Sequence, residues 1–163
     1  MRVLAQKGSR LLAVIRIRGK VGIRPDIEAA LKALNLHRVN HGVVLEESAS
    51  LMGTLQKSKD YVTWGEISQD TLSLLLTKRG RLGGGVRLTD TSAKEKLGFE
   101  SVDDLTERVW TGKTALSSIS GLNRVFRLHP PRGGFRRSKK RHYPDGELGY
   151  RRSAIDELLR KMA

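Results

Sequence analysis

Thr111–Thr114 (TGKT) matches the end of a phosphate-binding loop, in which backbone amides and a lysine hold the phosphates of a nucleotide. Such a loop needs a glycine five positions before its Gly-Lys pair, and Glu107 stands there, within a predicted helix. The glycines of 80–85 also lack the spacing of a dinucleotide-binding loop and indicate a turn, or a place where backbone approaches a partner closely. A nucleotide-dependent enzyme is therefore an alternative that rests on the TGKT tetrapeptide alone.

His37 and His41 are four positions apart, a spacing that on a helix can hold a metal ion. The neighbouring valines Val39, Val43 and Val44 favour a strand instead, and the chain has no cysteine to complete a ligand set. No serine lies in a nucleophile-elbow motif. We predict no metal, no cofactor, no small-molecule substrate and no catalytic residue.

The stretch 131–142 (PRGGFRRSKKRH) holds six arginines and lysines in twelve positions and no acidic residue. Arginine binds phosphate groups bidentately, and aromatic rings can stack on unpaired bases. Gly133 and Gly134 allow the backbone to lie close to a phosphate. Half of the chain's eight aromatic residues lie in 124–152, namely Phe126, Phe135, Tyr143 and Tyr150. For Phe126 and Tyr150, anchoring on the body of the protein is an equally open interpretation.

Charge is distributed unevenly along the 163 residues, whose formal net charge is +14. Residues 1–24 carry seven basic and no acidic groups, and 124–152 carry ten basic and two acidic groups. The intervening 25–123 carry twelve basic and thirteen acidic groups, so a nearly neutral body lies between two positive segments. This pattern is typical of proteins that neutralise nucleic acid phosphates. The first apolar stretch, 11–15, is too short for a signal peptide or membrane span, and we expect a cytoplasmic protein without a membrane partner.

The periodicity of apolar residues predicts the strands and helices that position these groups. Residues 11–18 alternate as a strand, and the two faces hold Leu11, Ala13, Ile15 and Ile17 on one side and Leu12, Val14, Arg16 and Arg18 on the other. A helix is predicted from Pro25, a strand over 37–47, a helix capped by Ser48, and a strand over 60–67. The order predicts an α+β fold, an open β-α-β-α-β sandwich with helices on one face of the sheet.

Beyond Ile67 we predict a helical extension that begins with a helix capped by Ser68 and includes an irregular basic arm over about 124–152. The domains are therefore expected as 1–67 and 68–163. The arm is poor in aliphatic side chains, and ordering its backbone would cost about 1–2 kcal/mol per residue. We accordingly expect about 130–148 to be disordered until RNA binds.

Several segments together resemble the large-subunit ribosomal protein L thirty family, which is L seven in eukaryotes. The resemblance covers nearly the whole chain, and its strongest signatures are RIRG, RPDI with LKAL, WGEIS and PRGG. It implies a ferredoxin-like core that binds large-subunit ribosomal RNA near the 5S RNA, neighbouring ribosomal proteins, and no enzyme activity. Within this resemblance, the extension after Ile67 and the missing long basic leader are expected of the archaeal type.

The residues expected to contact RNA lie near the core strand and in the arm. They are Arg16, Arg18, Lys20, Arg24, Arg127, Arg132, Gly133, Gly134, Phe135, Arg136, Arg137, Lys139, Lys140, Arg141 and His142. We expect the sheet face with Arg16 and Arg18 to be exposed and to be the RNA side. A free-standing nucleic-acid chaperone remains an alternative, because it would share the basic segments.

Overall fold

The computed structural model describes residues 10–163, so Arg2 and Lys7 of the N-terminal basic segment lie outside the described residues. The strands are β1 (Leu11–Arg16), β2 (His41–Glu46), β3 (Val62–Glu66), β4 (Phe126–Arg127), β5 (Ser138–His142) and β6 (Gly146–Tyr150). The α-helices are α1 (Pro25–Ala33), α2 (Ala49–Lys57), α3 (Gln69–Arg79), α4 (Asp90–Ser92), α5 (Val102–Trp110) and α6 (Ile155–Met162). Short helical turns over Gly83–Gly85, Ala93–Leu97, Leu116–Ser118 and Arg152–Ala154 complete the described secondary structure. None of the helices between residues 10 and 163 is long and apolar enough to cross a bilayer.

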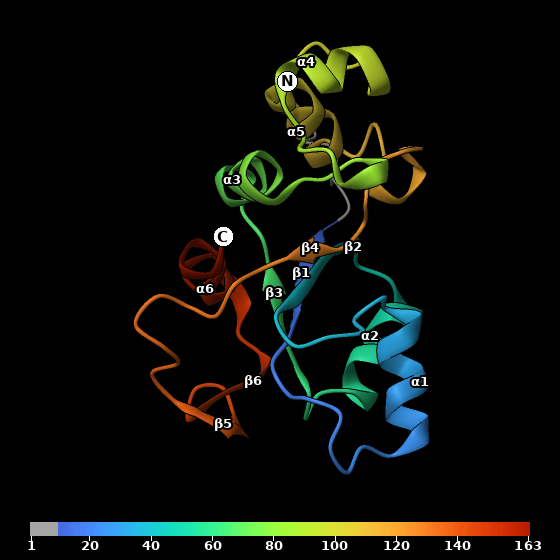
Figure 1. The fold of residues 1–163 in the computed structure, drawn as a ribbon. Helices are drawn as coiled ribbons and strands as arrows, with labels where there is room; N and C mark the ends of the chain where they lie inside the picture. The colour runs from blue at the N-terminus through green and yellow to red at the C-terminus, as the bar shows by residue number, and fades with distance from the viewer. Residues whose placement is uncertain (1–9) are drawn as a thin grey trace, which may run out of the picture.

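A single six-stranded sheet with the order β4-β2-β1-β3-β6-β5 organises the chain (Figure 1). β1 lies at its centre and pairs antiparallel with β2 and β3, with Val14 opposite Val43 and Trp64. β6 adds to β3 in parallel, and β4 and β5 form the two edges. The α+β class and the ferredoxin-like arrangement predicted from the sequence are confirmed, and the sheet continues on both sides beyond the three predicted strands.

Two apolar clusters cover the two faces of the sheet. Leu12 and Val14 of β1 pack with α1 and α2, through buried side chains such as Leu31 and Leu55. The alternate residues of β1 pack on the opposite face with α3, α5 and α6, through residues such as Leu76. The strand parity was therefore predicted correctly. The expectation of helices on one face only is wrong, because helices from the extension cover the second face (Figure 1).

The starts of the first three helices follow the local signals in the sequence. Pro25 occupies the first position of α1 with acidic residues in the first turn. The Ser48 side chain accepts a hydrogen bond from the Leu51 amide, and Ser68 accepts one from the Thr71 amide, so both are N-caps as predicted. Local sequence signals thus determine where these three helices begin.

The segment predicted as an irregular arm contains β5 and β6, which join the sheet at the β3 edge. Leu148 is only 1% exposed, and the ion pair between Glu147 and Arg151 lies in the interior with side chains 7% and 5% exposed. The Arg151 guanidinium also donates to the Thr63 hydroxyl over 2.7 Å, which ties the segment to β3. The expectation of a disordered 130–148 segment therefore disagrees with the structure, since long-range pairing stabilises what the local composition cannot.

Candidate nucleic-acid interface

Arg16 is buried and does not belong to an exposed face, contrary to the sequence-based expectation. Its side chain is 1% exposed, and it donates from Nη1 to the Leu36 carbonyl at 2.7 Å and from Nε to the Arg18 carbonyl at 2.8 Å. Burial lowers the pKa of the Arg16 guanidinium, and the charges of Glu28 and Tyr61 oppose that shift. Arg16 is buried because α1 and α2 cover this face of the sheet. Its hydrogen bond to Leu36 connects the end of β1 to the turn after α1.

Arg18 and His142 of the basic arm both contact Asp60. Arg18 Nη1 donates to the Asp60 backbone carbonyl at 3.3 Å, and its guanidinium lies 5.1 Å from the centre of the Tyr61 ring. His142 Nε2 lies 2.9 Å from the Asp60 carboxylate, and both side chains are about half exposed. Two groups 124 positions apart in the chain are therefore brought to one place by the α2–β3 connection.

Lys20 and Arg24 lie in the loop between β1 and α1, and both are exposed. Arg24 forms an ion pair with Asp26 at 3.0 Å, with the two side chains 75% and 39% exposed. Between these cations, Val21 is 99% exposed at the tip of the loop. Lys20 forms no ion pair within residues 10–163 and remains available to a partner.

Strand β5 presents a continuous row of exposed basic residues. Every residue from Ser138 to His142 is exposed, and Lys139, Lys140 and Arg141 follow one another on the edge of the sheet. No carboxylate of the described chain lies within ion-pair distance of these three side chains. One interpretation is that charge on an edge strand prevents pairing with other chains. A row of three unpaired cations also suits contact with a phosphate backbone.

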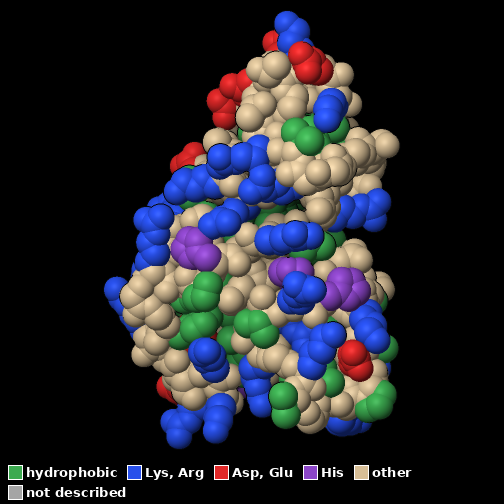
Figure 2. Space-filling view, viewed as in Figure 1, with side chains coloured by type: hydrophobic (Ala, Val, Ile, Leu, Met, Phe, Trp, Pro, Cys, Tyr) green, Lys and Arg blue, Asp and Glu red, His purple; other side chains and the backbone are tan. Residues whose placement is uncertain are grey.

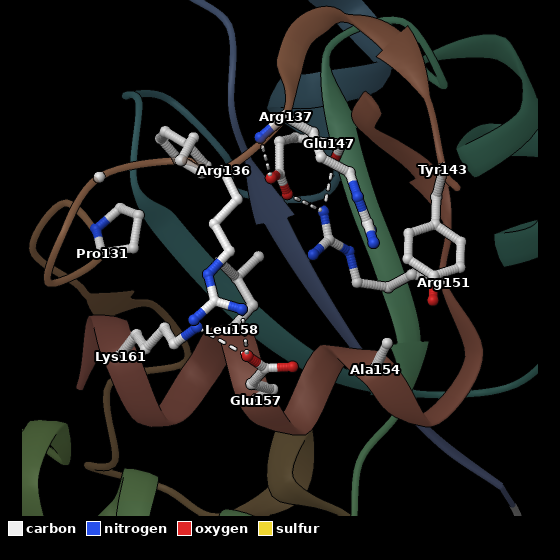
Figure 3. A pocket seen from close by; sticks show the side chains of 12 residues that line it. Pro131, Arg136, Arg137, Tyr143, Glu147, Arg151, Ala154, Glu157, Leu158 and Lys161 are labelled. Carbon is white, nitrogen blue, oxygen red and sulfur yellow. Dashed lines mark hydrogen bonds and ion pairs between the residues drawn. The ribbon is translucent and has the colours of Figure 1, made fainter. Parts of the chain in front are cut away.

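At a small cavity between the arm and α6, carboxylates of the protein itself neutralise part of the arm's charge (Figure 3). Arg136 reaches the Glu157 carboxylate at 3.9 Å, and Lys161 lies 2.6 Å from the same group. Lys161 lowers the pKa of Glu157 by hydrogen bonding and charge, and Arg136 adds to the effect. The backbone amide of Arg137 donates to the buried Glu147 carboxylate at 3.0 Å. This cavity holds its own carboxylates, so we do not regard it as an anion site.

Before the cavity, the chain passes over the end of α6 through Arg132, Gly133 and Gly134, all exposed. The Arg132 amide donates to the Lys161 carbonyl at 3.1 Å, which fixes the start of this turn. Both glycines have positive φ, 79° and 76°, and an added side chain at either would meet open space. The arginine and the exposed glycine backbone are thus turned outward at the position where the sequence predicted them.

Three of the four aromatic residues of the basic segment pack against the rest of the protein, and Tyr150 remains exposed. Phe126 is 1% exposed in the core, and Phe135 is half-buried against the same cluster with the Lys139 ammonium 5.0 Å from its ring centre. The guanidiniums of Arg137 and Arg151 lie 5.1 Å and 5.7 Å from the Tyr143 ring centre. Tyr150 remains 42% exposed, with its hydroxyl on the Glu66 carboxylate, whose hydrogen bond and charge raise the pKa of the phenol along with burial. Anchoring therefore accounts for Phe126, and the ring of Phe135 is less available for stacking than expected.

Arg127 lies at the other edge of the sheet, in β4, and is exposed beside the partly exposed His41. Burial is the main cause that lowers the pKa of His41. The nearby charges lower the pKa further, and they belong to Arg127, Arg38, His37 and Arg16. Near Arg127 the structure also places Arg79 and Arg81, which flank the start of the glycine turn after α3. These two arginines were not among the predicted site residues, although their position on either side of Gly80, before a glycine run, was a visible signal.

Figure 2 shows many arginine and lysine side chains over the middle and lower parts of one face, and most of the acidic groups of this face toward its upper end. Of the predicted site residues, Arg18 and His142 are brought together at Asp60, Arg132 lies at the end of α6, and Arg127 stands apart at the β4 edge. Arg16 is excluded from these places by burial.

The motifs that suggested other chemistry have structural roles. Thr111 caps the end of α5, and Gly112 follows with a φ of 75°, so TGKT lies at the C-terminus of a helix, where carbonyl oxygens rather than amides point outward. His37 lies in the connection before β2, and His41 begins that strand. Within residues 10–163, no three histidine or acidic side chains gather as a metal-ligand set.

Comparison with known proteins agrees with the resemblance found in the sequence. The family model "Ribosomal protein L30p/L7e" matches residues 12–62. The protein named "Large ribosomal subunit protein uL30" of Methanosphaera stadtmanae is 48% identical over 152 residues, covering 93% of this chain and 99% of the relative. Proteins of the same name from Archaeoglobus fulgidus and Thermoplasma acidophilum are each 47% identical over 93% of this chain, covering 99% and 92% of the relatives. The chain therefore belongs to the ribosomal protein L30p/L7e family.

Proposed function

We propose that this chain is a structural constituent of the large ribosomal subunit and binds ribosomal RNA. Its contacts would come from the basic arm, the β1–α1 loop and Arg18. Family membership supports the ribosomal role, and the names of the archaeal relatives describe those proteins as proteins of the large ribosomal subunit. In this role the chain acts by binding and needs no catalytic group.

The observation that carries the RNA proposal is the row of unpaired cations on β5. Lys139, Lys140 and Arg141 are exposed on an edge strand whose backbone is held by β6. Because the strand fixes the backbone beforehand, binding would order only side chains, and its entropy cost would be smaller than for a free arm. Arg18 and His142 converge on Asp60 and extend the same positive region toward the β1–α1 loop.

The proposal includes 5S RNA as a neighbouring molecule. This part rests on the family resemblance alone. Crosslinking in an assembled archaeal large subunit, with the site read from the RNA, tests it directly. A crosslink from Lys139 or Lys140 to 5S RNA is the expected result, and crosslinks confined to other RNA would overturn this part.

The test of RNA binding is a variant with Lys139→Gln, Lys140→Gln and Arg141→Gln, titrated with deproteinised large-subunit ribosomal RNA from Archaeoglobus fulgidus. Removing one cation that binds a phosphate should reduce the slope of log affinity against log salt by about 0.7–0.9. For the three substitutions, the slope should therefore fall by about 2–3, and the melting temperature should not be lowered. An unchanged slope in the variant would contradict the proposed role of β5.

Sedimentation with ribosomal subunits distinguishes a ribosomal constituent from a free-standing chaperone. We expect the chain to remain with the large subunit through a high-salt wash, because many contacts would hold it simultaneously. Release at moderate salt, with equal affinity for unrelated RNA, would favour the chaperone.

A further inference from the structure

A basic groove lies at the β4 edge of the sheet, at the opposite edge from β5 of the arm. We call it the arginine groove and define it by Arg79, Arg81, Gly83–Gly85, Asn123 and Arg127. The fold holds its two walls together. The Gly83 amide donates to the Gly121 carbonyl at 2.8 Å, and the Asn123 amide donates to the Arg81 carbonyl at 2.8 Å. Leu82 and Leu122 pair beneath it and are buried in the core.

The charges of the groove are unbalanced within the described protein. Arg79, Arg81 and Arg127 take part in none of the ion pairs found in residues 10–163, and the residues lining the groove include no acid. Moreover, Arg81 pairs across an antiparallel bridge with Arg87. Like charges placed directly opposite each other are destabilising, so the fold alone gives no reason for this pair. An anion in the groove would supply the missing counter-charge.

Gly83 is a second indication of a ligand. Gly84 and Gly85 have φ values of 80° and 79°, so the turn itself explains those two glycines. Gly83 has no positive φ, and the nearest atom to an added Cβ would be the Gly121 carbonyl oxygen at 4.0 Å. Nothing in the fold therefore requires glycine at position 83. A glycine that is exposed and free of internal constraint allows a ligand to approach the backbone closely.

We propose that the arginine groove binds the phosphodiester backbone of RNA, as a contact separate from β5. Three guanidiniums with planar, paired donors suit successive phosphates, and the exposed glycine turn lets the chain of phosphates lie against the backbone. An acidic peptide is the other polyanion that could lie there. A guanidinium can donate two parallel hydrogen bonds to a carboxylate as well as to a phosphate. RNA is favoured because it carries a phosphate at every nucleotide, and because the proposed function already has RNA as the partner of this chain. The proposal rests on the proposed RNA-binding function.

The first variant carries Arg79→Gln, Arg81→Gln and Arg127→Gln, which keeps the apolar stems and removes three charges. A control removes the same charge at exposed lysines elsewhere, with Lys57→Gln, Lys94→Gln and Lys96→Gln. Both are titrated with the Archaeoglobus fulgidus large-subunit RNA over a range of salt, beside the β5 variant. We expect the affinity of the groove variant to fall about tenfold or more and its salt slope to fall by about 2–3, with much smaller changes in the control.

The second variant is Gly83→Ala, which tests close approach without any change of charge. We expect unchanged or slightly raised thermal stability, because alanine restricts the unfolded chain and meets no atom closely in the fold. Its RNA affinity should fall several-fold, because the added methyl group stands between backbone and phosphate. The matched change Gly84→Ala should lower stability instead, because its φ of 80° is strained for alanine.

The outcomes separate the two proposals. If the wild-type chain and the β5 variant bind the RNA equally weakly, the proposed function fails. If the β5 variant binds less tightly while the groove variant equals its lysine control, only the groove proposal fails. A groove variant with weaker affinity for polyglutamate but unchanged affinity for RNA would assign the groove to an acidic peptide and would also overturn the proposal.

Discussion

Arg16 is the largest fully buried side chain among the described residues. Its two hydrogen bonds go to the backbone carbonyls of Leu36 and Arg18, while its Nη2 has no partner within residues 10–163. A buried cation held by two carbonyls positions neighbouring loops, and the single unpaired nitrogen adds a cost to its burial.

We predict that Arg16→Met lowers the free energy of unfolding by about 3 kcal/mol, because two charge-assisted hydrogen bonds are removed and the Leu36 carbonyl is left buried without its donor. Urea denaturation measures the change. Arg18→Met is the matched control and should cost less than about 1 kcal/mol, because its one hydrogen bond is long and exposed. A stable Arg16→Met variant with weakened RNA binding would instead favour the exposed role predicted from the sequence.

His41 gives a prediction for the pH dependence of stability. Its pKa is lowered in the folded chain, chiefly by burial and by Arg127. The unfolded state therefore binds more protons below the ordinary histidine pKa of about 6.5, and stability falls as the pH drops through that value toward the folded pKa. His41→Gln should flatten the dependence of melting temperature on pH between about 7 and 5. An identical pH profile in wild type and variant would show that His41 is not the group responsible.

At the scale of elements, β5 and β6 show how a polar segment is held in a sheet. Gly146 begins β6, and a Cβ there would overlap the carbonyl of Arg141 in the preceding strand. The close contact leaves room for glycine alone, so the position of β5 depends on this residue.

We predict that Gly146→Ala separates β5 from β6 and lowers stability, and that hydrogen exchange of the amides in β5 becomes fast. Gly53→Ala within α2 is the control, since an added Cβ meets no atom within 4 Å. Because alanine favours helix over glycine, the control should gain about 0.5–1 kcal/mol. Fast exchange throughout β6 in the wild-type chain would contradict this view and would support the disordered arm expected from composition.

For the whole molecule, the net charge of +14 is carried on a fold whose two sheet edges are both basic. Such a distribution repels itself when no anion is bound. Within the described chain, carboxylates such as Glu147, Glu157 and Asp60 neutralise only part of it.

We predict that the melting temperature of the isolated chain rises by several degrees as salt increases from about 0.02 M to about 0.2 M, because screening weakens this repulsion. The variant Lys139→Gln, Lys140→Gln, Arg141→Gln should show a smaller rise. Differential scanning calorimetry makes the measurement. A melting temperature that falls with salt would mean that favourable ion pairs outweigh the repulsion.

Several features could be predicted from the sequence because they depend on neighbouring residues. Alternation assigned the residues of β1 to the correct sides, since side chains in a strand point to opposite faces. Pro25, Ser48 and Ser68 marked helix starts, since capping involves atoms within one turn. The motifs resembled those of the L thirty family, which the comparisons confirm, whereas the charge blocks predicted only nucleic-acid binding.

Other features depend on contacts between distant parts of the chain, and only the tertiary structure decided them. Whether the second face of β1 is open or covered depends on where α1 and α2 pack, and that packing buried Arg16. The arm became part of the sheet through an ion pair and a bond to Thr63, 88 positions from Arg151. The arginine groove forms because residues 79–85 and 121–127 meet at one edge. Sequence by itself determined which residues are basic, apolar or capping, because those properties are local. Burial and proximity are properties of the folded chain, and they decided which of the basic residues remain exposed.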